Sequence, residues 1–182
     1  MQELSLHVLD LVQNAVEAGA DRVQVEIEED EAADRLRLVI TDNGKGMEAA
    51  QAAQLTDPFY TTRTSRRVGM GVPLLAAAAE ATGGELRVQS APGRGTTVEV
   101  RFGLSHLDRA PLGDMGATIA TALVGRPGLE LVYRHRAAAG EYVFDTEALR
   151  RELGEVPLDQ PAVTGWIGAE VRRGLADIGS IA

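Results

Sequence analysis

The chain has 182 residues, 45% of them hydrophobic, which suffices for a buried core in one domain or in one domain with an extension. Its 27 acidic and 18 basic residues give a formal net charge of -9, which argues against a nucleic-acid clamp because such a clamp neutralises phosphates. The absence of cysteine excludes disulfides, thiolate metal sites and cysteine nucleophiles.

No apolar run approaches the length of a membrane span, and the opening MQELSLH lacks the basic and apolar regions of a signal peptide. We therefore expect a cytoplasmic protein that does not insert into a membrane.

The first segment predicts an amphipathic helix that Gly19 ends. Its apolar residues recur at helical spacing: Leu4, Val8, Leu11, Val12 and Ala15. On another face, His7, Asp10, Asn14 and Glu17 follow one another at helical spacing, so Asp10 and Asn14 are stacked one turn apart. The Asn14 amide oxygen suits Mg²⁺, which prefers hard oxygen ligands and bridges to phosphates, and Asp10 can polarise a water. The alternative is a solvated helix face.

The second segment predicts a strand over 35–41 that ends in a glycine turn, DNGKG. Asp42 at the strand end can accept a hydrogen bond from the N6 amino group of adenine, whereas guanine places an acceptor there. Gly44 and Gly46 allow positive φ and the close approach of a flat ligand. The alternative is an ordinary turn.

The third segment places Gly69 and Gly71 before a predicted helix with Pro73 in its first turn. Free backbone N–H groups and the helix dipole make such a junction suitable for phosphate oxygens. Residues 58–79, which include the segment before this helix, contain no acidic residue. They do contain Arg63, Arg66 and Arg67, which predicts a basic lid over a polyphosphate. The alternative is a flexible loop with solvated arginines.

The fourth segment, APGRGTTVEVRF, predicts a turn followed by an alternating strand that Thr96 or Thr97 opens. A hydroxyl there can contact adenine directly or through a water, or it can satisfy local backbone groups.

After residue 104 the sequence predicts a helix near 115–123, two alternating strands joined by a small-residue turn, and two further helices. Asp145 or Thr146 is the predicted cap of the first of these helices, and Asp159 with Pro161 is the predicted start of the last. We expect residues 105–182 to pack on, or extend the sheet of, a domain formed by residues 1–104.

These four segments, in this order, resemble the motifs of the GHKL ATP-binding superfamily of histidine kinases, gyrase, heat-shock chaperones and MutL-type ATPases. LDLVQNAVEAGA is similar to its Asn box, DNGKGM and GMGVP to its glycine boxes, and GRGTTVEV to its final box. The resemblance implies a Bergerat-type fold, an α+β two-layer sandwich with a small C-terminal extension here. It implies the cofactors ATP and Mg²⁺, with the metal on Asn14, adenine on Asp42 and support of the base by Thr96.

The same resemblance assigns the remaining pocket residues. Those of the two glycine boxes and the lid are Gly44, Gly46, Met47, Arg63, Arg66, Gly69, Met70, Gly71 and Val72. Asp10 takes the catalytic position, where hydrolysing relatives usually carry glutamate and histidine kinases asparagine. Because Asp10 is acidic but one methylene shorter than glutamate, weak hydrolysis, phosphotransfer to a protein partner in trans, and nucleotide sensing without catalysis all stay open.

The three histidines do not lie on a preceding dimerisation hairpin, so autophosphorylation of the usual kind is not expected. His106 and Asp108 form a polar turn in preference to a metal pair. HLDRAPLGDM, VYRH and VPLDQPAV extend the resemblance to small stand-alone histidine-kinase-like ATP-binding proteins of anaerobic bacteria, whose genes often neighbour iron hydrogenase subunits. That resemblance implies a role near a redox enzyme.

Overall fold

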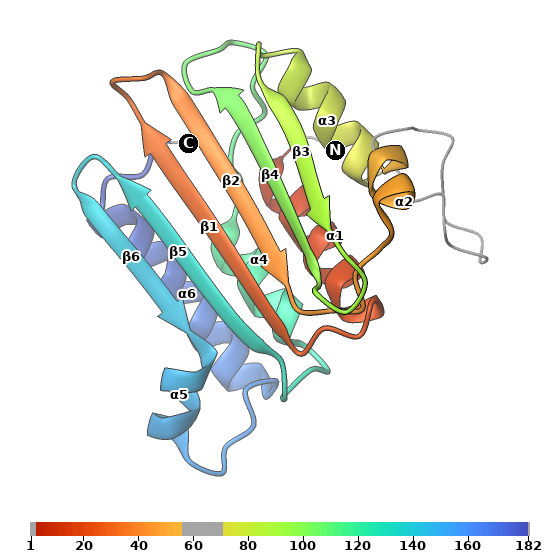
Figure 1. Cartoon of the computed structure of the whole chain (residues 1–182). Helices are drawn as coiled ribbons and strands as arrows, with labels where there is room; N and C mark the ends of the chain where they lie inside the picture. Colours follow the sequence, from red (N-terminus) through yellow and green to blue (C-terminus); the bar gives the residue numbers. More distant parts are fainter. Residues whose placement is uncertain (1–2, 56–70, 182) are drawn as a thin grey trace.

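A computed structural model describes residues 3–55 and 71–181, in which one six-stranded mixed sheet carries a layer of helices on one face (Figure 1). The strands are β1 (Arg22–Asp30), β2 (Arg35–Asp42), β3 (Glu85–Ser90), β4 (Thr96–Gly103), β5 (Glu130–Ala137) and β6 (Gly140–Asp145). The helices are α1 (Leu4–Glu17), α2 (Ala49–Gln54), α3 (Gly71–Glu80), α4 (Met115–Leu123), α5 (Thr146–Leu153) and α6 (Pro161–Asp177). This architecture confirms the predicted α+β two-layer sandwich.

The sheet has the strand order β3-β4-β2-β1-β5-β6. All neighbours are antiparallel except β1 and β5, which run parallel with Val23 beside Leu131. Residues 130–145 therefore continue the sheet that the N-terminal strands begin.

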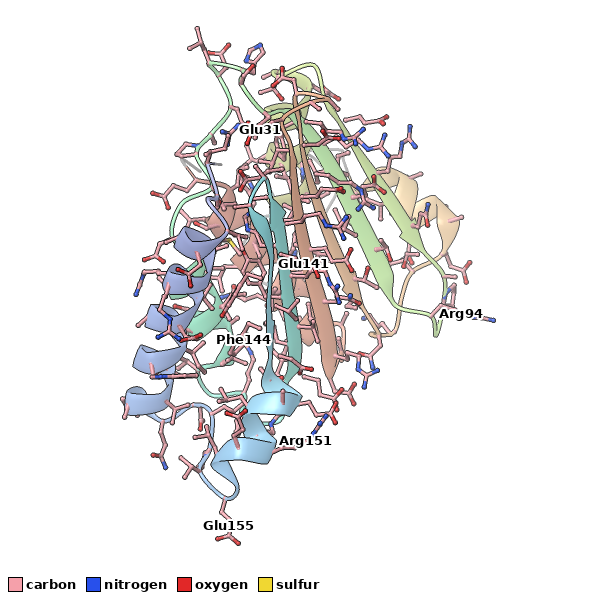
Figure 2. All side chains as sticks on the ribbon, turned by 90° about the vertical axis from the view of Figure 1, so that its left-hand side faces the viewer. Glu31, Arg94, Glu141, Phe144, Arg151 and Glu155 are labelled. Carbon is pink, nitrogen blue, oxygen red and sulfur yellow. The ribbon has the colours of Figure 1, made fainter. Side chains whose placement is uncertain are left out.

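The core lies between the sheet and the helices, because the strands turn apolar side chains toward α1, α3, α4 and α6. One buried cluster contains residues from both halves of the chain, for example Val8, Leu38, Ile119, Leu131 and Ile167. Figure 2 shows the sheet from the side, with α6 lying along β5 and β6. The two sequence regions therefore share a single hydrophobic core.

The opposite face of the sheet is charged. One row crosses all six strands and consists of Glu85, Arg101, Arg37, Glu28, Arg136 and Glu141. Its ion pairs include Arg101–Glu85 at 3.4 Å and Arg136–Glu141 at 3.3 Å, and Glu141 is labelled in Figure 2. Such exposed pairs stabilise a fold only weakly, so this face acts mainly as a solvated surface.

The C-terminal helices test the predicted boundaries. The helix predicted near 115–123 is confirmed as α4, and Asp145 is confirmed as the cap of α5, since its side chain accepts from Glu147 N at 2.8 Å. The predicted role of Asp159 is wrong, because Gln160 is the N-cap residue of α6 and makes no side-chain capping bond. Pro161, with its fixed φ, begins that helix without such a bond. In the part of the chain that the structure describes, no helix has the length and apolarity needed to cross a bilayer.

Candidate nucleotide site

The α1 helix carries two of the predicted site residues on its polar side. Asp10 and Asn14 are half-buried, and His7, one turn before Asp10, is only 2% exposed. Burial lowers the pKa of His7 below its ordinary value, since the charged imidazolium loses hydration there. This row of α1 is therefore not a solvated helix face along its whole length.

Asp10 lies directly against the start of α3. A Cβ built on Gly71, the first residue of α3, would overlap the Asp10 carboxylate, so a side chain there would force that carboxylate to move. The backbone of Gly71 also makes a hydrogen bond with the His7 side chain. The acidic side chain of α1 thus meets the end of α3 where helix N–H groups have no intrahelical partner.

Three polar side chains form a row where β2 and β3 end and β4 begins. Asp42 is the register partner of Thr96, and Thr96 is the partner of Ser90. Residues opposite one another on neighbouring strands point to the same face. That face is the helix-covered one, because Ile40 and Val98, two residues along from Asp42 and Thr96, are buried in the core.

Asp42 is held by backbone donors. Its Oδ1 accepts from Gly44 N at 2.8 Å, and Thr96 contributes a second backbone hydrogen bond. Burial nevertheless raises the pKa of Asp42 above its ordinary value, because these bonds only partly offset the lost hydration. The result is a fixed carboxylate at the edge of the core.

The loop after β2 and the turn before β4 interlock through two glycines. Gly46 has a φ of +64°, and a Cβ on it would overlap the Ala91 carbonyl. Gly95 has a φ of +75°, and a Cβ there would overlap the carbonyl of Asp42. A side chain at either position would push the loop and the turn apart.

The same loop is bonded to its surroundings through the backbone. Lys45 N donates to the Ala18 carbonyl at the end of α1 at 3.0 Å, and Gly93 N donates to the Lys45 carbonyl at 2.7 Å. Gly44 is buried next to Ala18. The helix α1 therefore joins the sheet end at Asp42 to the start of α3.

Two side chains that hold the loops around Asp42 and Thr96 in place, Ser90 and Asn43, were not predicted from the sequence. Ser90 Oγ lies 2.9 Å from Met47 N, from the Gly95 carbonyl and from Thr96 Oγ1. Asn43 Oδ1 accepts from Asp21 N at 3.2 Å and from Arg22 N at 3.0 Å, which fixes the start of β1. A signal for Ser90 existed, since a polar residue there breaks the inward alternation of β3.

The structure brings several of the predicted site residues to the end of the sheet where β2 ends and β4 begins, the lower end of these strands in Figure 1. Asp42 ends β2, Thr96 opens β4, and Gly44, Gly46 and Met47 follow β2. Gly71 and Val72 begin α3. Arg63, Arg66, Gly69 and Met70 lie outside the described residues.

The donor set suits a metal that is held mainly by phosphates and water. Within residues 3–55 and 71–181, no three His, Asp or Glu side chains gather closely enough to hold a metal ion. Asn14 and Asp10 instead offer one amide and one carboxylate oxygen, both hard ligands that Mg²⁺ accepts. His106 Nδ1 accepts from Asp108 N at 3.1 Å, which is the geometry of a polar turn.

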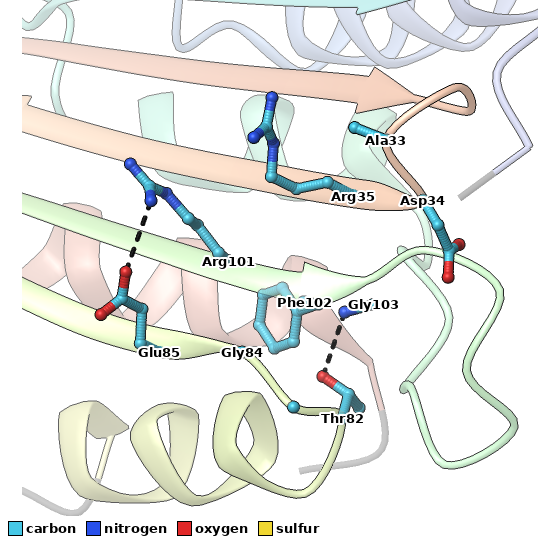
Figure 3. A pocket seen from close by; sticks show the side chains of 10 residues that line it. Ala33, Asp34, Arg35, Thr82, Gly84, Glu85, Arg101, Phe102 and Gly103 are labelled. Carbon is cyan, nitrogen blue, oxygen red and sulfur yellow. Dashed lines mark hydrogen bonds and ion pairs between the residues drawn. The ribbon is translucent and has the colours of Figure 1, made fainter.

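A cavity of about 530 Å³ lies at the other end of the sheet (Figure 3). Its two arginines are paired with carboxylates, Arg101 with Glu85 at 3.4 Å and Arg35 with Asp30 at 3.1 Å. Asp34 and Glu85 add negative charge to its wall. Because its arginines are already paired with carboxylates, this cavity is a poorer candidate for binding phosphate than the N-terminal start of α3.

Comparison with known proteins assigns the fold to a family. The family model described as "Histidine kinase-, DNA gyrase B-, and HSP90-like ATPase" matches residues 2–106, which is more than half of the chain. The chain belongs to this family. It therefore carries a histidine-kinase-like ATPase domain, an ATP-binding domain, over the region that contains all four sequence motifs.

Relatives of this ATPase domain include bacterial sensor kinases. The chain is 43% identical over 89 residues to sensor protein kinase FleS of Pseudomonas aeruginosa, covering 49% of this chain and 22% of FleS. It is 34% identical over 91 residues to signal transduction histidine-protein kinase AtoS of Escherichia coli, covering 50% of this chain and 15% of AtoS. The chain thus corresponds to less than a quarter of either kinase.

A solved structure supports the fold beyond the family match. The crystal structure of the N-terminal domain of a DNA repair protein aligns with a TM-score of 0.55 and 15% identity. The alignment covers 79% of this chain and 52% of that chain, so the shared architecture extends past residue 106.

Proposed function

We propose that this ATPase domain binds ATP with Mg²⁺ between α1, α3 and the sheet, and that it hydrolyses ATP weakly or transfers the terminal phosphate to a protein in trans. Adenine would contact Asp42 and Thr96, and the phosphates would lie at the start of α3 beside Gly71. The observation that carries this proposal is the contact between Asp10 and Gly71, which places a carboxylate beside the predicted phosphate position.

The chemistry assigned to the residues follows from their types. Asn14 would hold the metal, which lowers the charge on the terminal phosphate when bound. Asp10 would accept the proton of the attacking water or side chain. The arginines Arg63 and Arg66, whose positions lie outside the described residues, would neutralise phosphate charge.

Transfer in trans is supported by the places of the histidines. His7 and His135 are buried, at 2% and 0% exposure, so neither can receive a phosphate in this fold. His106 is exposed but follows the far end of β4, whose first residue is Thr96. A strand rises about 3.4 Å per residue, so eight residues separate the two ends by roughly 25 Å. A partner protein would supply the acceptor, and the resemblance to proteins encoded beside iron hydrogenases favours a redox enzyme.

Two measurements test this proposal. Isothermal titration with ATP, ADP and GTP should show magnesium-dependent binding of the adenine nucleotides only, and a phosphate-release assay should then detect slow turnover. Asp10→Asn should abolish turnover and leave ATP affinity within about threefold, because the amide keeps the shape of aspartate but cannot accept the proton.

The alternative is a sensor that binds nucleotide without catalysis. It predicts no phosphate release from the unmutated protein, even with excess enzyme, and different protection from proteolysis by ATP and by ADP. Absence of nucleotide binding would contradict both versions.

A further inference from the structure

Ser90 occupies an unusual position in the hydrogen bonding around the proposed base site. Its side chain is the meeting point of three segments: the glycine loop at Met47, the turn at Gly95 and the first residue of β4, Thr96. Ser90, Thr96 and Asp42 also form one row on the helix-covered face, through the register pairs of β3, β4 and β2. A change at Ser90 therefore reaches Thr96, one of the two residues proposed to contact the base.

The donors and acceptors around Ser90 fix its single proton. A serine hydroxyl has one O–H to donate and two lone pairs to accept with. Met47 N–H can only donate to it, at 2.9 Å, and the Gly95 carbonyl can only accept from it, also at 2.9 Å. The proton of Ser90 thus goes to Gly95, and one lone pair is left for Thr96 Oγ1, 2.9 Å away.

The contacts of Ser90 set the direction of the Thr96 hydroxyl. All three contacts are satisfied together only when Thr96 donates its proton to Ser90. The lone pairs of Thr96 Oγ1 then face away from Ser90. Asp42, the register partner of Thr96, already accepts the backbone N–H of Gly44 and has no proton to donate when ionised. The row presents two acceptors side by side.

We infer that Ser90 is a specificity-determining residue that keeps the Thr96 hydroxyl an acceptor and so favours adenine over guanine. The inference rests on the proposed nucleotide site and extends it. Adenine offers an amino group with two protons at the position where guanine has a carbonyl oxygen. With Thr96 locked as an acceptor, a guanine carbonyl meets two acceptors and no donor.

The test compares affinities for ATP and GTP. Losing the fixed direction of the Thr96 hydroxyl and loosening the loop at Met47 change these two affinities differently. In Ser90→Ala the Thr96 proton is released and can reach a guanine carbonyl, so the ratio of the GTP to the ATP dissociation constant should fall at least about fivefold. A merely loosened loop would weaken both nucleotides by the same factor and leave the ratio unchanged.

Three further variants separate the alternatives. Ser90→Thr keeps the hydroxyl and should restore the ratio. Thr96→Val removes the hydroxyl that Ser90 orients, so adding Ser90→Ala to Thr96→Val should change the ratio no further. Thr41→Val is the matched control, since the Thr41 hydroxyl pairs with Thr97 at 3.2 Å on the exposed face and should leave the ratio unaltered.

Each variant is measured by isothermal titration of the full chain with magnesium and either nucleotide, after its melting temperature shows that it is folded. If Ser90→Ala does not fold, Ser90→Cys, with its weakly hydrogen-bonding thiol, takes its place. An unchanged ratio in a protein that binds ATP overturns the role of Ser90 and leaves the proposed site intact. Failure of the unmutated protein to bind ATP overturns the proposed site itself.

Discussion

At the scale of single residues, the proposed site makes Asp42 the residue that selects the base. We predict that Asp42→Asn weakens ATP binding about tenfold or more. It should also reduce the difference in affinity between ATP and GTP, because the new amide can donate to a guanine carbonyl. The magnitude follows from about 1–3 kcal/mol for one mispaired buried polar group. Competition between the two nucleotides measures it, and ATP binding unaffected by the change would contradict the assignment.

The raised pKa of Asp42 gives a second prediction at this scale. Burial disfavours the ionised form, so the carboxyl gains its proton at a pH above the ordinary value of 3.8 as the solution is acidified. The protonated form presents an O–H on one oxygen, so recognition of the adenine amino group should weaken over the same range. A ¹³C NMR titration of the Asp42 carboxyl carbon reports the midpoint, and a midpoint at or below 3.8 would show that burial does not dominate.

At the scale of elements, the contact between α1 and α3 controls where the Asp10 carboxylate sits. Gly71→Ala should displace that carboxylate and lower phosphate release by about tenfold to a hundredfold, since a misplacement near 1 Å has that effect on a rate. Gly165→Ala in α6, where a Cβ meets nothing within 4 Å, is the matched control. It should leave turnover alone and raise stability by up to about 1 kcal/mol. Equal turnover in both variants would remove Asp10 from the mechanism.

The elements also show what a sequence can predict. Alternation and helical periodicity located α1, β2, β4 and α4, because each has one face in the core and one outside it. Strand β1 alternates as clearly, at Val23, Val25 and Ile27. Its parallel pairing with β5 was not predictable, because β5 comes from the far half of the chain and alternation does not encode pairing over such a separation.

The candidate site was predictable only in part. Motif residues such as Asp42 and Gly71 were proposed from their order along the chain. The hydrogen bonds of Ser90 connect β3 with the loop after β2 and with β4, and these contacts exist only after the sheet has formed. Hydrogen-bond direction at Thr96 is therefore a property of the fold and not of the local sequence.

At the scale of the whole molecule, a buried polar cluster ties the chain end to the sheet. His135 Nε2 lies 2.6 Å from Glu29 Oε1, Ser180 Oγ donates to the same oxygen at 2.6 Å, and Ile181 N donates to Glu29 Oε2 at 2.9 Å. Tyr133 OH completes the cluster, 2.7 Å from His135 Nδ1. Every one of these groups depends on Glu29 or His135 for its partner, so the cluster links β1, β5 and the segment after α6.

The cluster predicts a pH dependence of stability. Burial opposes ionisation of Glu29, but the hydrogen bonds from His135, Ser180 and Ile181 outweigh it and lower the pKa of Glu29 below 4.5. The stabilisation is therefore complete above pH 4.5 and is lost as the pH falls through the lower pKa of the folded state.

Glu29→Gln should lower the free energy of unfolding at pH 7 by about 1–3 kcal/mol, and its loss of stability on acidification should be shallower. Glu28→Gln, the neighbour on the exposed face, should cost less than about 1 kcal/mol. Urea unfolding at several pH values compares the two variants, and equal losses would mean that burial adds nothing at Glu29.

The proposed function depends on where the nucleotide binds. A crystal structure of the protein grown with Mg²⁺ and a nonhydrolysable ATP analogue tests it most directly. We predict adenine beside Asp42 and Thr96, the metal on Asn14, and the terminal phosphate near Asp10 and Gly71. A nucleotide bound elsewhere, or no nucleotide between α1, α3 and the sheet at saturating concentration, would contradict the proposed site.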